Sequence, residues 1–258
     1  MDRLRNVFGK LNLIVEGIPC IRIVDPEVKR ICLTSWDFDK DGDISVKEAE
    51  SATTLFKIFS GNSKIETFEE FKNFKNISTT YDGNFNGCSS LRRISLPESY
   101  IGIRHNDFYG TALEHIDLPS TLISISAAFT DVFTLKEITI PESVTNITGG
   151  AFDGTGLSRF VFPKGIKEIN GISRMQNLTY VEIGENAISV TNLSDCPKLV
   201  VVIIRAAYPP STTYWTLRNT PTPNIYVPDA SVVAYKESSG WKAWAANIKP
   251  LSSYNGNL

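Results

Sequence analysis

Twelve consecutive residues carry the side chains of this sequence that could do chemistry. Residues 37–48 read DFDKDGDISVKE. Carboxylates stand at positions 1, 3, 5, 7 and 12 of this stretch, which are Asp37, Asp39, Asp41, Asp43 and Glu48. Ca²⁺ is a hard cation that takes about six to eight oxygen ligands, and a carboxylate at the twelfth position can supply two of them. The spacing therefore predicts a site for one Ca²⁺.

The other positions supply what an EF-hand loop needs besides carboxylates. Gly42 stands at position 6, where the backbone must turn sharply. Position 7 gives its backbone carbonyl, and Ser45 at position 9 gives an oxygen directly or through water. Ile44, at position 8, is the residue that normally packs in a short β-bridge. An acidic turn that binds no metal is the alternative interpretation.

No second loop of this kind occurs in the sequence. EF-hands usually occur in pairs, and paired sensor loops open when they bind the ion. We therefore expect the lone loop to act as a structural clip. The loop also resembles a dockerin repeat, but dockerins carry two copies, so the sequence disfavours a cohesin partner.

Two helices must position this loop. The entering helix is expected over Asp25–Trp36, with a proline in its first turn, where the fixed φ of proline is favourable. The exiting helix is expected over Val46–Phe59, with its apolar residues roughly on one side: Ala49, Ala52, Leu55, Phe56 and Phe59. The apolar residues of Ile65–Phe74 would join this helix to the next part of the chain. The preceding segment, Leu11–Val24, is expected to be extended, without an assigned place.

A repeat of 21–22 residues follows. Its leucines are separated by 22, 22, 22, 21 and 21 residues: Leu91, Leu113, Leu135, Leu157, Leu178 and Leu199. Apolar residues recur three and five positions after each leucine, and twelve positions after five of them. Proline recurs six positions after four of the leucines. An aromatic residue recurs near the end of three units, as Phe108, Phe129 and Phe152.

Each unit is expected to form a short strand, a proline turn, a second extended segment and a tight return. Proline ends the strand because it has no N–H to donate to a neighbouring strand. A single unit cannot enclose its own apolar side, whereas stacked units bury one continuous ladder. The 27 Ile and 16 Val against 18 Leu also favour strands over helices. A β-sandwich is the alternative, but it would not repeat proline and phenylalanine at fixed offsets.

The end of such a stack exposes its core and a strand edge, so the C-terminal residues are expected to cover it. Ile225–Pro228 predicts a final strand, and Asp229 is expected to be the N-cap of a helix that runs to about Glu237. Trp241–Ile248 follows. The apolar area would come from three aromatic residues, Tyr235, Trp241 and Trp244. A tryptophan cluster that binds carbohydrate is the less favoured alternative.

The unit L-x-x-I-x-(L/I)-P, with its later isoleucine and phenylalanine, resembles the BspA-type leucine-rich repeat, also called the Treponema pallidum type or LRR_5. The best copy is LKEITIPESVTNITGGAFDGTG, and the resemblance covers about residues 68–225. The segments VKRICLTSWDFDKDGDISVKEA and IETFEEFKNF resemble the region before these repeats in gut-bacterial proteins. IYVPDASVVAYKESSGWKAW resembles the closing segment of many members.

This resemblance implies an α+β solenoid. The expected form is a right-handed superhelix of 21–22-residue coils, with a helical EF-hand-like N-terminal cap and a strand–helix C-terminal cap. The corresponding domains are an N-terminal cap region over 1–66, the repeats over 67–225 and a C-terminal cap over 226–258.

The composition and the missing motifs disfavour several classes of protein. A formal net charge of −2 gives no electrostatic footprint for nucleic acid. No apolar run is long enough to span a membrane, and no secretory signal is visible. The four scattered cysteines argue against a zinc site and suggest buried thiols, with a Cys20–Cys32 disulfide left open. Two histidines, His105 and His115, stand in no catalytic order, so we expect no enzymatic activity.

The outward side of the strands remains as a binding surface. Side chains two positions after each leucine point out of the strand, and in the first five units these are Arg93, His115, Glu137, Arg159 and Tyr180. Solenoids bind extended partners on such faces, although a solvated face without a ligand would look the same.

The resemblance implies a non-enzymatic bacterial protein, secreted or at the cell surface and stabilised by one Ca²⁺. We expect a monomer that binds a protein or glycan on a host or neighbouring cell, as in adhesion. A structural spacer that presents other domains and a carbohydrate-binding accessory protein are the alternatives.

Overall fold

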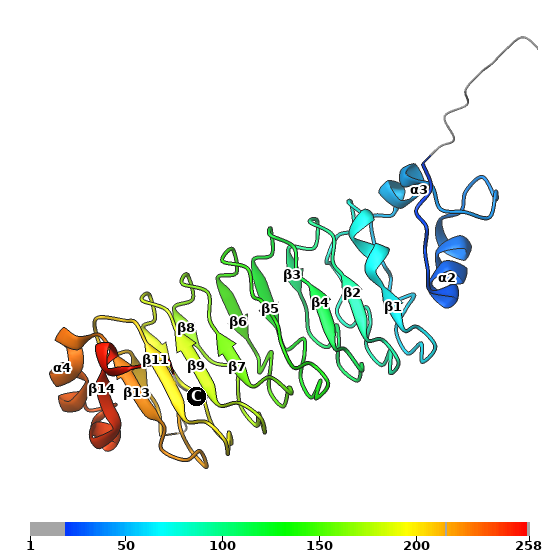
Figure 1. Ribbon diagram of the computed structural model, residues 1–258. Helices are drawn as coiled ribbons and strands as arrows, with labels where there is room; N and C mark the ends of the chain where they lie inside the picture. The colour runs from blue at the N-terminus through cyan, green and yellow to red at the C-terminus, as the bar shows by residue number, and fades with distance from the viewer. Residues whose placement is uncertain (1–18, 215, 257–258) are drawn as a thin grey trace, which may run out of the picture.

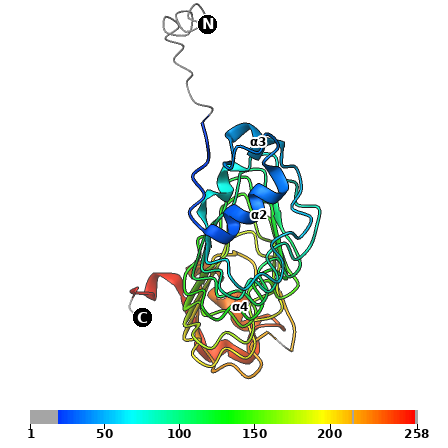
Figure 2. The same cartoon turned by 90° about the vertical axis from the view of Figure 1, so that its right-hand side faces the viewer.

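The computed structural model describes residues 19–214 and 216–256, in which successive coils of the chain stack along one axis (Figure 1). The helices α2 (Pro26–Trp36) and α3 (Val46–Ser51) lie at one end of the row, and α4 (Val232–Glu237) lies at the other. In the view turned by 90°, the coils overlie one another, with α2 and α3 in front (Figure 2). The prediction of a solenoid of stacked repeats is confirmed.

Parallel strands of consecutive repeats form two sheets, with equivalent positions in register. Arg93 pairs with His115, for example, and Tyr180 pairs with Val201. One sheet contains β1 (Thr67–Phe68), β2 (Arg93–Ser95) and β4 (His115–Asp117). The other contains β7 (Arg159–Val161), β9 (Tyr180–Ile183), β11 (Val201–Ile204), β13 (Asn224–Val227) and β14 (Ile248–Pro250).

The second extended segment of each unit forms further parallel strands, as the repeat predicts. These are β3 (Gly102–Ile103), β5 (Ser124–Ser126), β6 (Asn146–Thr148), β8 (Glu168–Ile169), β10 (Ser189–Val190) and β12 (Ser211–Thr212). They pair in the orders β3-β5-β6 and β8-β10-β12. Coils that contain both strands therefore form backbone hydrogen bonds to neighbouring coils through two separate segments.

The leucines that begin the units form one buried ladder, and each of the six is at most 1% exposed. A second ladder consists of phenylalanines. The rings of Phe85, Phe108, Phe129 and Phe152 stack at centroid distances of 5.6, 5.2 and 5.2 Å, with interplanar angles of 1°, 4° and 13°. Phe59 extends the stack by a further 5.4 Å contact with Phe85. The sequence predicts this column from three phenylalanines. In the structure, two more phenylalanines, Phe85 and Phe59, extend it towards the N-terminus.

The parallel ladder is interrupted at the unit that begins at Leu135. Residues 136–140 form no strand, although their sequence fits the repeat well. Within the described parts of the chain, no backbone hydrogen bond joins residues 136–140 to the coil on either side. Ile138 is only partly buried, whereas Ile94 and Phe160, at the same position of other units, are at most 1% exposed. The break separates the sheet that ends at β4 from the sheet that begins at β7.

The entering helix lies where the sequence predicts it. Its N-cap is Asp25, whose Oδ1 accepts hydrogen bonds from the N–H groups of Glu27 and Val28 at 2.9 and 3.0 Å. Such a cap satisfies backbone donors that the first turn of a helix leaves unpaired.

The exiting helix is shorter than predicted. It ends at Ser51, so the prediction of a helix through Phe59 was wrong. Phe56 is 65% exposed, whereas Phe59 is fully buried against Phe85. The stacking of Phe59 on the next coil requires a turn where a continuing helix would carry it away.

The segment that joins the N-terminal helices to the repeats forms β1 and the 3-10 helix η1 (Glu69–Asn73). Its predicted apolar residues are all fully buried: Ile65, Phe68, Phe71 and Phe74. The rings of Phe68 and Phe71 stack at 5.0 Å. This aromatic cluster connects the N-terminal helices to the first coils.

The C-terminal region contains one strand more than predicted. β14 pairs in parallel with β13, with Ile248 in register with Ile225. Between these strands lie η2 (Asp229–Ser231), α4 and η3 (Lys242–Asn247), and η4 (Leu251–Ser253) follows β14. The prediction that Asp229 caps a helix was wrong, because its Oδ1 instead accepts the Ser252 N–H at 3.0 Å. That bond ties η4 to η2.

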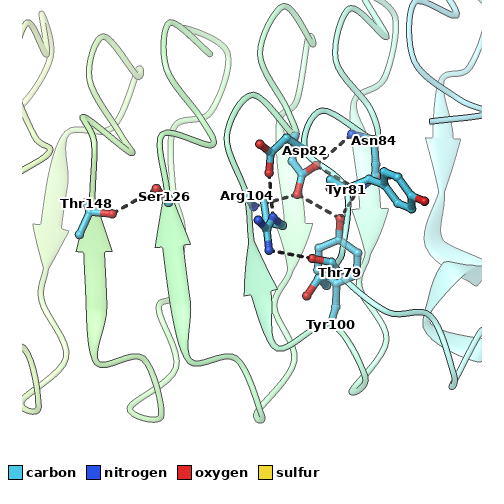
Figure 3. A network of polar contacts seen from close by, with 9 residues as sticks. Thr79, Tyr81, Asp82, Asn84, Tyr100, Arg104, Ser126 and Thr148 are labelled. Carbon is cyan, nitrogen blue, oxygen red and sulfur yellow. Dashed lines mark hydrogen bonds and ion pairs between the residues drawn. The ribbon is translucent and has the colours of Figure 1, made fainter. Parts of the chain in front are cut away.

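A buried polar network joins two coils near the N-terminal end (Figure 3). The fully buried carboxylate of Asp107 accepts hydrogen bonds from the Asn84 N–H at 2.9 Å, the Tyr100 hydroxyl at 3.1 Å and the Arg104 N–H at 2.9 Å. Burial raises the pKa of Asp107. Arg104 also forms an ion pair with Asp82 at 2.7 Å. The network supplies partners that these groups would otherwise lose on leaving water.

The Cys20–Cys32 disulfide left open by the sequence is not formed. Cys32, Cys88 and Cys196 are buried as predicted, but Cys20 is exposed. Over residues 19–214 and 216–256, no helix is both long enough and apolar enough to cross a membrane. Most of the segment predicted to be extended, Leu11–Val24, lies outside the described residues.

Candidate functional site

Three of the five predicted metal ligands come together at the start and end of the acidic loop. Oxygen atoms of Asp37, Asp39 and Glu48 lie within 4.8 Å of one another. Asp37 Oδ1 is buried and has no hydrogen-bond partner among the described residues. A buried carboxylate oxygen without a donor is unfavourable unless a cation compensates it.

Glu48 is held in place by the first turn of α3. Its Oε2 accepts hydrogen bonds from the N–H and the hydroxyl of Ser45, both at 2.9 Å, and Ser45 Oγ accepts the Glu48 N–H. Its Oε1 accepts the Phe38 N–H at 2.8 Å. The Ser45 N–H is the main cause that lowers the pKa of Glu48, although burial opposes it. These hydrogen bonds therefore favour the charged form of the carboxylate at position 12 and orient it within the loop.

The remaining aspartates have different roles in the loop. Asp41 Oδ1 accepts the Asp43 N–H at 2.9 Å, and the Asp43 side chain pairs with Lys29 of α2 at 2.7 Å. The ion pair of Asp43 does not conflict with the predicted pattern, because position 7 contributes its backbone carbonyl. Gly42 adopts a φ of +88°, which L side chains rarely reach.

Carboxylate crowding affects Asp39. The Asp41 N–H donates to Asp39 at 3.2 Å, which favours the charged form. Burial and the charges of Asp41, Glu48 and Asp37 outweigh this bond and raise the pKa of Asp39. A cation among these groups would relieve their mutual repulsion.

The N-terminal strand segment supplies the β-bridge that a second EF-hand loop would normally provide. The Ile21 N–H donates to the Ile44 carbonyl at 2.7 Å, and the Val46 N–H donates to the Pro19 carbonyl at 2.9 Å. Cys20 and Ser45 form the bridge pair. The sequence predicts that Ile44 packs in a bridge, but it gives no signal for the partner, because the partner strand has no loop motif of its own.

The helix that enters the loop is bound directly to the first strand of the solenoid. Asp25 Oδ2 accepts the N–H groups of Glu66 and Thr67 at 2.8 and 3.2 Å. Trp36 at the end of α2 contacts the ring of Phe74 at 5.2 Å. Fixing the loop therefore fixes the packing of α2 on the first coils.

The donor set fits Ca²⁺. It consists of hard oxygen ligands, with a buried unpartnered carboxylate oxygen at position 1 and an oriented glutamate at position 12. No thiol or imidazole belongs to the cluster of Asp37, Asp39 and Glu48, which argues against a zinc site there.

The strand face, defined as the outward side of β2, β4, residues 136–140, β7, β9 and β11, carries the predicted binding residues. Four of the five point outward and are accessible: Arg93, His115, Glu137 and Arg159. Arg93 pairs with Glu69, and His115 Nε2 lies 3.0 Å from Asp117. The structure places these four residues in one row that crosses the break in the ladder.

Two clefts flank the break. One, of about 430 Å³, lies between β4 and residues 137–139 and is lined by His115, Asp117 and Glu137 among others. The other, of about 540 Å³, lies between residues 136–140 and β7 and is lined by Glu137, Arg159 and Phe162 among others. Glu137 therefore stands between two open grooves on the strand face.

Tyr180 is the predicted binding residue that is not accessible. Only 2% of it is exposed, because η4 and Tyr254 fold back over the strand face. Tyr180, Val201 and Ile203 form an outer apolar cluster with Leu251 and Tyr254, separate from the main core.

Polar groups also surround the Tyr180 side chain. The Arg159 guanidinium lies 3.6 Å from its ring centre, and its hydroxyl donates to Glu182 at 2.6 Å. Burial and the Glu182 carboxylate raise the pKa of Tyr180 to about 12. The C-terminal residues thus cover one half of the strand face and leave the half from β2 to β7 open.

Comparison with known proteins identifies the repeats. Residues 56–178 match a family model described as the BspA type leucine rich repeat region, in six copies. No curated protein matches the chain significantly.

Three solved structures are similar. A leucine-rich repeat protein from Bacteroides ovatus is 22% identical, with a TM-score of 0.46, and the match covers 61% of this chain and 44% of that chain. The leucine rich repeat protein TpLRR of Treponema pallidum is 21% identical, with a TM-score of 0.38 and coverage of 74% and 77%. A leucine rich cell surface protein from Faecalibacterium prausnitzii is 17% identical, with a TM-score of 0.35 and coverage of 73% and 63%. This chain therefore spans less than half the length of the Bacteroides ovatus protein.

Proposed function

Since the chain belongs, over residues 56–178, to the BspA-type leucine-rich-repeat proteins, we propose that it binds an extended segment of a partner protein on the open half of its strand face. It does so without enzymatic chemistry, at the bacterial surface or after secretion, as in adhesion to a host or neighbouring cell. The protein acts as a monomer, and one Ca²⁺ stabilises its N-terminal region.

The break in the ladder is the observation that carries this proposal. Each strand of a parallel sheet offers N–H and C=O groups to both neighbours. At residues 136–140 these groups have no backbone partner in the adjacent described coils, and the same holds for the facing sides of β4 and β7. Unpaired strand edges are templates for an added extended segment. The two adjacent clefts give the side chains of such a segment a place to bind.

The charges beside the break indicate what the partner segment contains. Among the described residues, the Glu137 side chain forms no ion pair, whereas Arg93 pairs with Glu69 and Arg159 lies near Glu182. An exposed carboxylate between two clefts favours a basic side chain in the partner. We therefore propose a partner segment that carries lysine or arginine.

Two substitutions beside the break test this proposal. Glu137→Lys and Thr139→Lys change exposed side chains and leave the buried ladders intact. We expect each to weaken binding roughly tenfold, which corresponds to about 1.4 kcal/mol. The measurement is biosensor binding to a panel of immobilised extracellular-matrix proteins.

The matched control is Glu185→Lys, an exposed charge reversal in the turn between β9 and β10, away from the break. It should bind as the unmodified protein does. Equal binding by all three variants, or equal loss in all three, would place the binding site away from the break and contradict the proposal. Absence of binding to every protein of the panel would favour the alternative that the chain is a structural spacer.

The calcium part of the proposal rests on the loop. The side chains of Asp37, Asp39, Asp41 and Glu48, with the Asp43 carbonyl, would hold the ion. The ion would neutralise the carboxylates that crowd one another and would lock the turn between α2 and α3. Since α2 is bonded to β1 through Asp25, this would stabilise the first coils.

The two end regions are proposed to act as caps on a right-handed superhelix. Burial supports this for both: Phe74 is buried against Trp36 of α2, and Tyr235 of α4 is buried against the ring of Trp241, which directly precedes η3. The proposed domains are the N-terminal cap over 1–66, the repeats over 67–225 and the C-terminal cap over 226–258. The family match begins at residue 56, inside the range proposed for the N-terminal cap.

A further inference from the structure

A cleft of about 450 Å³ lies between the last coil and the C-terminal helices, far along the chain from the strand-face break. One wall consists of Thr212, Thr213, Tyr214, Leu217 and Arg218, and the other consists of Ser239 and Gly240 with Ala243 and Trp244 of η3. Its size falls within the range of about 300–1,000 Å³ that is typical of small-molecule sites. We propose that this cleft is a carbohydrate-binding site that takes one or two pyranose rings.

Two aromatic rings give the cleft its apolar surface. Tyr214 is 83% exposed, and Trp244 is partly buried, with Leu217 and Ala243 beside them. A ligand that packs on these rings would remove apolar area from water, which is favourable. The C–H face of a pyranose is flat and apolar, so it matches such rings.

The base of the cleft is rigid. The Trp241 indole N–H donates to the Pro210 carbonyl at 2.7 Å, and Trp244 packs edge-on against the fully buried Trp241 at 5.7 Å. The Thr212 hydroxyl donates to the Gly240 carbonyl at 3.0 Å and joins the two walls. A Cβ at Gly240 would come within 2.5 Å of Thr212 Oγ1, so a larger residue there would displace this hydroxyl. Because these contacts already hold Trp244 in place, a ligand that packs on it costs little conformational entropy.

The polar groups at the rim match the hydroxyls of a sugar. The Ser239 hydroxyl can both donate and accept hydrogen bonds, and the Thr213 hydroxyl, which donates to the Thr191 carbonyl at 3.2 Å, can still accept one. Arg218 adds a positive charge. The residues that line the cleft include Arg218 but no carboxylate. The cleft therefore favours a neutral sugar or one that carries a carboxylate, and it disfavours a cation.

A peptide fits this cleft less well. A bound peptide strand needs a free sheet edge, and the nearest strand, β12, spans only Ser211–Thr212. The outer side of Thr212 is in contact with Gly240, which occupies that edge. The site is also separate from the strand face, so this inference does not depend on the partner proposed there.

The chain offers a closely matched pair of variants for the test. Tyr214→Ser removes an aromatic ring from the cleft, and Tyr208→Ser removes a ring that is equally exposed, at 85%, but does not line it. Neither change touches the buried core, so both proteins should fold. The probes are cellobiose, maltose, lactose and digalacturonate, titrated into the full chain by calorimetry, with tryptophan fluorescence as a second readout.

We expect at least one of these sugars to bind and to change the tryptophan fluorescence. Tyr214→Ser should raise the Kd at least tenfold, whereas Tyr208→Ser should leave it unchanged. Arg218→Gln separates the two kinds of sugar, because it should weaken digalacturonate selectively if the ligand is acidic and should affect neutral sugars little. Absence of binding by all four sugars, or equal loss in the two tyrosine variants, would overturn the proposal. So would binding that Glu137→Lys abolishes, because that residue lies on the strand face.

Discussion

Phe108→Ala is expected to lower the free energy of unfolding by about 3–5 kcal/mol, the range for truncating a buried aromatic ring. Phe108 is fully buried and stacks on Phe85 on one side and on Phe129 on the other. Its loss removes contacts to two neighbouring coils at once and leaves a cavity between them. Since a solenoid is stabilised by contacts between adjacent repeats, the loss of these contacts should destabilise the whole array. Urea unfolding followed by circular dichroism gives the measurement.

The adjacent Tyr109→Ala is the control for this prediction. Tyr109 is 45% exposed, so its truncation should cost less than 1 kcal/mol, or roughly the effect of an ordinary surface substitution. Similar losses from Phe108→Ala and Tyr109→Ala would mean that the phenylalanine stack does not hold the coils together. A separate early transition in Phe108→Ala would show that the two halves of the array unfold independently.

Glu48→Gln is expected to remove most of the stabilisation by Ca²⁺. A ligand at a hundred times its Kd stabilises the folded state by about 2.7 kcal/mol, so chelation should lower the melting temperature of the unmodified protein clearly. Glutamine can still accept the Ser45 N–H and so retains the capping box of α3. The variant therefore tests the second oxygen and the charge of the bidentate ligand, with the helix start left intact.

The matched control is Glu50→Gln, which removes an exposed carboxylate two residues away. Its melting temperature should respond to Ca²⁺ and to chelator as the unmodified protein does. A melting temperature of the unmodified chain that does not change on chelation, with no metal found by elemental analysis, would remove the calcium proposal. An equal response of Glu48→Gln and the unmodified protein would show that the ion binds elsewhere.

The periodicity of the sequence predicted the solenoid well, because the columns of the repeat decide which side chains face inward. The Leu and Phe columns lie in the core as expected. The same columns could not predict the break at residues 136–140, since they do not determine whether two backbones approach within hydrogen-bond distance. LKEITIP fits the pattern as well as its neighbours, yet its strand is not formed.

The apolar spacing after the acidic loop gave a wrong prediction, because the same spacing fits a helix and an irregular coil of the solenoid. Ala49, Ala52, Leu55 and Phe59 fit one side of a helix, but the stacking of Phe59 on Phe85 ends the helix at Ser51. Tertiary packing overrides local propensity in such cases.

Contacts between segments far apart in the chain could not be predicted from the sequence either. The covering of Tyr180 by Tyr254 and the pairing of Pro19–Ile21 with the acidic loop join parts of the chain that share no motif. The acidic loop itself is a local pattern, so its ligand positions could be named from the sequence. The cleft beside Trp244 could not, because its two walls come from different elements.

Hydrogen–deuterium exchange across the strand face tests the central claim most directly, because it needs no partner. The proposal depends on backbone groups at the break that have no partner in the neighbouring coils. The N–H groups of Ile138 and Ile140 should exchange roughly tenfold or more faster than those of Val181 and Val202, which lie within the continuous sheet. Equal protection at all four positions would show that the ladder is continuous there and would contradict the proposed binding surface.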